Sequence, residues 1–260
     1  MTKPLRALRF LSLALASAAL VAACGGSDDD SLDDRADTAQ PKVRFVHAVP
    51  GGPAVTLTRN GVAESGLTNV DYKYADQYYD VSTEAYTFSL RTAVGDTELA
   101  NVRLIAERGN KYTLLALPST SGAELLAVDD PYNKSVASDN ARVRVVNASP
   151  NAQAFDVYLT APGADLTTLS PRVTNVGYKQ VLPASGADSV EVEGGEYVLR
   201  LTPTGSKTAF FTAAMTVPRD ADWLLVTLPE DATPQVADAV RILRVRSDDS
   251  ADATDEIVSQ

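Results

Sequence analysis

The chain contains two copies of one sequence pattern. Residues 42–50 and 142–150 read KVRFVHAVP and RVRVVNASP, at an offset of 100 residues. Three later pairs of segments follow in the same order at offsets of 106, 111 and 111: 69–73 with 175–179, 86–90 with 197–201, and 111–118 with 222–229. An offset that grows in steps while the order is kept is typical of a duplicated domain whose loops have lengthened. We therefore expect two domains of one fold.

Short segments of alternating apolar and polar residues dominate both copies, and no extended pattern of period 3.6 is visible. Such segments, separated by turn residues such as Asn60-Gly61, are typical of antiparallel β-strands. In the first copy we expect strands at 43–48, 54–59, 66–70, 78–82, 85–92, 98–107, 112–118 and 124–128. The predicted fold class is all-β, with two tandem antiparallel immunoglobulin-like β-sandwich domains.

The predicted organisation has six parts. They are a signal peptide (1–23), a lipidated acidic tether (24–41), the first sandwich (42–131), a linker (132–140), the second sandwich (141–246) and a flexible tail (247–260).

The N-terminus indicates export. Three basic residues, Lys3, Arg6 and Arg9, precede the mainly apolar run 10–23. This run has 14 residues, fewer than the roughly 20 that a helix needs to cross a bilayer. A basic start, a short apolar run and small residues at its end are typical of a cleavable secretory signal.

The segment Val21-Ala22-Ala23-Cys24 resembles the lipobox of bacterial lipoproteins. The resemblance implies cleavage before Cys24, acylation of its sulfur, and a membrane partner reached through this lipid. It also accounts for the single cysteine of the chain, which has no partner for an internal disulfide. We expect a cell-envelope location, and Gly25 favours the outer membrane if the cell is Gram-negative.

Charge narrows the classes of partner. Without residues 1–23 the chain has 20 Lys and Arg against 34 Asp and Glu, a net charge of −14. Nucleic-acid binding relies on basic side chains that neutralise phosphates, so this balance argues against a nucleic-acid partner.

The segments around Val43–Pro50 and Val143–Pro150, each followed by an alternating strand, resemble the bacterial envelope family known as domain of unknown function 4397. The likeness covers about 200 residues and is closer in the second copy. The first copy departs from it at Thr56, where the second has Asp156. The resemblance implies a secreted or lipid-anchored protein with an immunoglobulin-like sandwich, and it implies no catalytic residues.

Chemistry-bearing residues are sparse. His47 is the only histidine and Asn147 replaces it in the second copy, so we expect a side chain that fixes the following turn. Arg44 and Arg144 match each other, and we interpret them as charges that protect an edge strand, with an anion site as the alternative. The acidic pairs, at 129–130, 220/222 and 248–249, lack the spacing of a calcium loop, so we interpret them as solvated loop charge. We expect no cofactor, no metal and no catalytic site.

The best candidate for ligand binding is a tyrosine cluster in the segment 71–80. Tyrosine combines a flat apolar face with a polar tip, which suits glycan and protein surfaces. The second copy keeps one of the four, so the fold does not require the other three; the alternative is that these rings pack on the sandwich. The predicted ligand-binding residues are Tyr72, Tyr74, Tyr78 and Tyr79.

These patterns favour a membrane-anchored envelope lipoprotein that acts as a non-catalytic binding or adhesion module for a glycan or protein ligand. A structural spacer or accessory subunit of an envelope assembly is the alternative, and a hydrolytic enzyme is the least favoured class.

Overall fold

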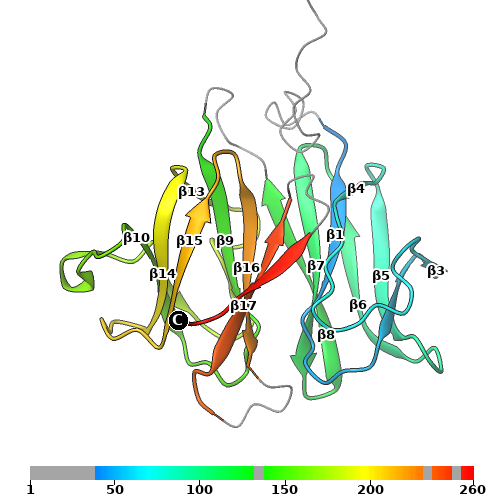
Figure 1. The fold of residues 1–260 in the computed structure, drawn as a ribbon. Helices are drawn as coiled ribbons and strands as arrows, with labels where there is room; N and C mark the ends of the chain where they lie inside the picture. Colours follow the sequence, from blue (N-terminus) through cyan, green and yellow to red (C-terminus); the bar gives the residue numbers. More distant parts are fainter. Residues whose placement is uncertain (1–38, 132–137, 231–235, 248–252) are drawn as a thin grey trace, which may run out of the picture.

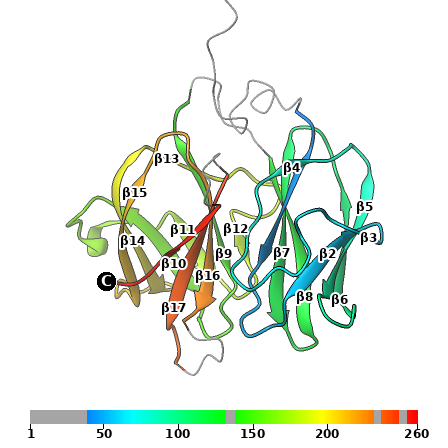
Figure 2. The ribbon, with the colours of Figure 1, turned by 45° about the vertical axis from the view of Figure 1, so that its right-hand side comes forward.

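The computed structural model describes residues 39–131, 138–230, 236–247 and 253–260. It shows an all-β protein built from two β-sandwiches that lie side by side (Figures 1 and 2). The predicted fold class is therefore confirmed. The expected signal peptide, Cys24 and nearly all of the acidic tether lie outside the described residues. Within them, no helix is long and apolar enough to span a membrane.

The first sandwich has two four-stranded sheets, in the orders β4-β1-β7-β8 and β3-β2-β5-β6. Its core lies between them and includes Phe45, Leu57, Phe88 and Leu114, all fully buried. Its strands are β1 (Lys42–His47), β2 (Val55–Arg59), β3 (Val62–Ala63), β4 (Tyr79–Asp80), β5 (Ala85–Thr92), β6 (Glu98–Ile105), β7 (Asn110–Ser119) and β8 (Gly122–Pro131).

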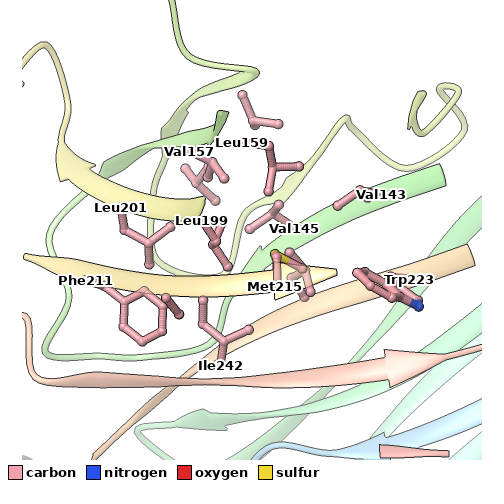
Figure 3. Packing of buried hydrophobic residues seen from close by; sticks show 14 of the residues in the cluster. Val143, Val145, Val157, Leu159, Leu199, Leu201, Phe211, Met215, Trp223 and Ile242 are labelled. Carbon is pink, nitrogen blue, oxygen red and sulfur yellow. The ribbon is translucent and has the colours of Figure 1, made fainter. Parts of the chain in front are cut away.

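The second sandwich pairs the sheet β12-β9-β16-β17-β18, in which β13 also pairs with β9, with the sheet β11-β10-β14-β15. Phe211, Leu199 and Ile242 meet in its core (Figure 3). Its strands are β9 (Ala141–Asn147), β10 (Phe155–Thr160), β11 (Val173–Val176), β12 (Val181–Leu182), β13 (Val190–Val192), β14 (Gly195–Pro203), β15 (Phe211–Val217), β16 (Asp222–Pro229), β17 (Val240–Arg246) and β18 (Thr254–Ile257). A 3₁₀ turn, η2 (Leu166–Thr168), precedes β11.

The two sandwiches share their strand register. Val43 pairs with Tyr112 in the first, and Val143 pairs with Trp223 in the second. These are the residues that the sequence offsets of 100 and 111 relate to each other. The other shared ladders also match under these offsets, as in the pairs Leu57–Leu90 and Val157–Leu201. The repeated sequence thus folds into repeated topology.

One pair of strands in each sandwich is parallel, β1 with β7 and β9 with β16, whereas the remaining pairs are antiparallel. A parallel neighbour requires a long connection, and here the connection passes through the opposite sheet. The sheets are therefore antiparallel in the main, with one parallel pair at the centre of each.

Two expectations are wrong: the strand at 66–70 and the wholly flexible tail at 247–260. Residues 66–70 do not form a strand beyond a single bridge from Val70 to Val55, because Gly66 and Asn69 adopt positive φ angles of 79° and 56°. The tail 247–260 is not wholly flexible, because β18 adds to the edge of β17 with Ile257 opposite Ile242. The apolar pair Ile257-Val258, which follows two acidic residues, was the available signal.

The sandwiches meet through one sheet of each, which we call the contact sheets. The first contact sheet contains β1, β7 and β8, and the second contains β9, β16 and β17. Successive side chains of a strand point to opposite faces, so Phe45 enters the first core while Val46 faces the second sandwich. Val46 lies in one buried apolar cluster with Val146, Leu228 and Leu243. Both faces of each contact sheet are thus covered.

Candidate functional site

The only histidine has a structural position. His47 is 1% exposed, and its Nδ1 accepts a hydrogen bond from the Val49 backbone N–H at 3.3 Å. The Asn147 Oδ1 accepts from the Ser149 backbone N–H at 3.1 Å in the same place. The expectation that these side chains fix the following turn is confirmed. Burial also lowers the pKa of His47.

The four predicted tyrosines do not gather on one surface. Tyr74 and Tyr79 pack against the first core, and Tyr72 packs against the apolar cluster between the sandwiches. Tyr78 lies elsewhere again, with its hydroxyl 3.2 Å from the Thr113 Oγ1. The segment is therefore a strap along the first sandwich with each ring in a different environment, and the structure assembles no aromatic platform from the four.

Tyr78 lies among cations of the contact sheets. The Arg44 guanidinium carbon is 4.4 Å from the centre of the Tyr78 ring, and the Lys111 Nζ is 5.5 Å from it. A cation over the face of an aromatic ring is attracted by its quadrupole. Burial raises the pKa of Tyr78 to about 12, so this hydroxyl is neutral at physiological pH.

Arg144 and Arg44 do not protect an edge. Strands β1 and β9 each have neighbours on both sides, and both arginines are only 2% exposed. The edge interpretation is wrong because the face of β1 and β9 that points away from each core is covered by the other sandwich. An arginine in an otherwise apolar strand here indicated a buried contact between domains.

Arg144 belongs to a buried ionic cluster, whereas Arg44 donates to the Thr113 Oγ1 at 2.9 Å and to the Ser247 Oγ at 3.0 Å. The centre of the cluster is Asp130, whose Oδ1 accepts hydrogen bonds from the Arg142 Nη2 and the Arg144 Nη2, both at 2.8 Å, and from the Ser189 Oγ at 3.1 Å. Arg142 also donates to the Asp222 Oδ2 at 3.2 Å. The Asp130 carboxyl has a lowered pKa because the attraction of both arginines outweighs its burial. The interpretation of the pair 129–130 as solvated charge is wrong for Asp130, because the position of this residue at the end of β8 places it in the buried contact.

A cleft opens on the first sandwich, between the edge strands β3 and β4. It has a volume of about 840 Å³, within the usual range for ligand sites. Sequence reasoning missed it because its walls come from separate turns and strand ends. Its polar lining includes Gln40, Arg59, Asn60, Glu64, Asp80, Ser82 and Glu84.

An ion pair forms one wall of this cleft. The Arg59 Nε lies 2.7 Å from the Glu64 Oε1, and their side chains are 32% and 10% exposed. The Arg59 guanidinium also lies over the Tyr86 ring, with its carbon 5.3 Å from the ring centre. The Tyr86 hydroxyl donates to the Ser82 carbonyl oxygen at 3.0 Å and to the Glu84 Oε1 at 2.9 Å. Charged donors and acceptors are thus held in fixed positions at the rim and wall.

The second sandwich keeps the scaffold of this region and changes its chemistry. Tyr197 replaces Tyr86, and its hydroxyl donates to the Glu193 carbonyl oxygen at 2.9 Å, as Tyr86 does to Ser82. The position of Arg59 holds Leu159 instead, and that of Glu84 holds Gly195. The ion pair and the rim carboxylate of the cleft are therefore features of the first copy and are not needed to build the sandwich.

The described residues contain no group of three or more His, Cys, Asp or Glu side chains that could hold a metal ion. Asp222, one of the acidic residues considered from the sequence, pairs with Arg142 in the contact between sandwiches. The pair 248–249 lies outside the described residues.

Residues 41–158 match the model of a protein family described as Domain of unknown function (DUF4397). The resemblance inferred from the repeated segments is thereby confirmed over this span, which runs through the first sandwich and into β10 of the second. A comparison with curated proteins finds no match.

Proposed function

We propose that this protein is a non-catalytic binding module of the cell envelope, anchored through Cys24, with its ligand in the cleft between β3 and β4. The observation that carries the proposal is the fixed ion pair of Arg59 and Glu64 in the wall of this cleft. Buried charges require close partners, and surface pairs contribute little to stability. The second copy has Leu159 at the position of Arg59 and forms the same sandwich without the pair, so recognition of a ligand explains this pair better than folding does.

The lining indicates a polar ligand. Arg59 and Asn60 supply donors, whereas Glu64, Asp80 and Glu84 supply acceptors. Hydroxyl and amide groups can both donate and accept hydrogen bonds, so they complement a wall that carries both kinds of group. A glycan or a polar segment of an envelope protein fits this description.

The anchor and location rest on the sequence: a basic start, a short apolar run and a lipobox-like segment that ends at Cys24. A Cys24→Ser variant is expected to leave the membrane fraction after export. Palmitate labelling of the wild type and its absence from the variant would support the anchor, and equal membrane retention of both would contradict it.

The binding test uses the mature chain with Cys24→Ser, titrated calorimetrically with envelope polysaccharide and, separately, with detergent-solubilised envelope proteins. Glu64→Gln and Arg59→Leu are expected to weaken binding to one of these by at least about tenfold, since each removes a charged contact. Arg219→Leu is the matched control, because Arg219 forms an exposed pair with Asp139 on the second sandwich. Equal binding by all four proteins, or none by the wild type, would remove the proposal.

A rigid spacer is the second candidate, favoured by the buried ionic and apolar contact between the sandwiches. A spacer function predicts that Glu64→Gln behaves as the wild type does in the envelope. Variants of Asp130, which weaken the contact, are expected to lose the function.

A further inference from the structure

The contact between the sandwiches is reciprocal. Val46 and Val146 occupy equivalent positions of β1 and β9, and both lie in the cluster between the sandwiches. Leu117 and Leu228, which the offset of 111 relates, lie in it as well. Each sandwich therefore contributes the same patch to the contact, as in an isologous dimer.

The polar contacts follow the same rule. The Arg44 Nη1 donates to the Ser247 Oγ at 3.0 Å, and the Arg144 Nη2 donates to the Asp130 Oδ1 at 2.8 Å. Arg44 and Arg144 are equivalent in β1 and β9. Asp130 and Ser247 are equivalent too. Asp129 pairs with Tyr112 and Arg246 pairs with the equivalent Trp223, and Asp130 and Ser247 are the residues that follow them. The first hydrogen bond crosses the contact in one direction and the second crosses it in the other.

Two equivalent loops close the sides of the contact. Lys73 and Lys179 both have positive φ angles, 73° and 65°. Lys73 pairs with Glu256 on β18 of the second sandwich, and the Lys179 Nζ lies 2.8 Å from the Glu124 Oε2 on β8 of the first. Each loop thus reaches across to the contact sheet of the other sandwich.

The reciprocity is broken at charged positions, most clearly at Asp130. This carboxylate accepts from both Arg142 and Arg144, whereas its equivalent Ser247 offers a neutral hydroxyl to Arg44. If the second contact sheet met a copy of itself, Arg144 would face a serine in place of a carboxylate. A buried charge that loses its partner is strongly destabilising.

From this geometry we infer that the contact sheets form an isologous docking surface, on which the second sandwich binds the first without help from the linker and Asp130 selects this pairing. The partner that fits the second sandwich is a sandwich of the same family with a carboxylate at the position of Asp130. This inference does not depend on the proposed ligand.

The test uses the full chain from Cys24, with Cys24→Ser and a specific protease site in place of residues 133–137. The folded protein is cleaved and passed through a size-exclusion column with light-scattering detection at micromolar concentration. The two fragments are expected to elute together as a one-to-one complex. Fragments that separate under these conditions would overturn the inference.

Selectivity is tested by Asp130→Ser, which installs the residue of the second sandwich. It is expected to raise the dissociation constant of the cleaved fragments at least about tenfold, because the buried Arg144 loses its carboxylate across the contact and Arg142 keeps only that of Asp222 in its own sandwich. Asp96→Ser, at an exposed pair with Arg91, is the control and should bind as the wild type does. Asp130→Asn, which keeps the side-chain shape, replaces the first variant if that one fails to fold. Unchanged affinity in whichever of these folds would refute the role of Asp130.

Discussion

The two sandwiches have the same strand order and register but differ at their edges. In the second, β18 adds to β17, and the Gln260 backbone N–H donates to the Thr212 carbonyl oxygen at the edge of β15. In the first, β8 is an edge strand of its sheet, and the cleft lies at the opposite edge, between β3 and β4. The comparison teaches that the scaffold and the contact sheets are common to both copies, whereas chemistry is added at the margins of one.

The largest expected effect concerns the broken symmetry of the contact. Asp130→Ala should destabilise the protein by about 3–5 kcal/mol, because the buried Arg144 loses its carboxylate partner and Arg142 keeps only that of Asp222. Ser247→Ala, at the equivalent position, should cost only about 1 kcal/mol, since it removes one hydrogen bond. Urea unfolding of both variants measures the difference. Equal losses of unfolding free energy would show that Asp130 contributes no more to the contact than Ser247 does.

The second prediction asks whether the sandwiches unfold together. Phe88 and Leu199 are equivalent, fully buried core residues of the first and second sandwich. Phe88→Ala should cost about 3–5 kcal/mol and Leu199→Ala about 2–5 kcal/mol. The only tryptophan, Trp223, belongs to the second sandwich.

The fluorescence of Trp223 should show the loss of unfolding free energy caused by Phe88→Ala as fully as that caused by Leu199→Ala, because the contact couples the two cores. If Phe88→Ala leaves the unfolding midpoint followed by Trp223 fluorescence unchanged, the sandwiches unfold independently.

The third prediction separates the cleft from the scaffold. Arg59→Leu gives the first sandwich the residue of the second; combined with Glu64→Gln it leaves no buried charge unpaired, and this double variant should change stability by less than about 1 kcal/mol. Thermal unfolding should thus be nearly unaffected while ligand binding is lost. A large fall in stability would mean that the ion pair is structural.

The smallest effect concerns pH. Burial lowers the pKa of His47 from 6.5, so below this pH the unfolded chain takes up a proton that the folded protein resists. Stability should therefore fall as the pH drops below 6.5. His47→Asn, the residue of the second copy, should remove this part of the acid sensitivity and keep the turn. Identical pH profiles for the two proteins would contradict this assignment.

Sequence patterns predicted the fold well because alternation and repetition are local signals. The offsets of 100 and 111 gave the equivalence of β1 with β9 and of β7 with β16, and the shared turn role of His47 and Asn147 followed from it. Thr56 and Asp156, noted as a difference, have one role, since they accept from the backbone N–H of Asn69 and Asn175.

The cleft and the contact were beyond such reasoning. Arg59 and Glu64 are close in sequence, but the other wall comes from Asp80 and Glu84, and nothing local links the two. Arg44 and Arg144 were visible as odd charges in apolar strands. Their partners Ser247 and Asp130 are brought to them only by the packing of one sandwich on the other.

The buried contact between the two contact sheets should join both sandwiches into one cooperative body. Differential scanning calorimetry of the mature chain with Cys24→Ser tests it directly. We expect a single transition in which the calorimetric and van't Hoff enthalpies agree, as for one cooperative unit. Two separate transitions would show that the sandwiches merely share a linker. A single broad transition whose van't Hoff enthalpy is about half of the calorimetric enthalpy would show the same.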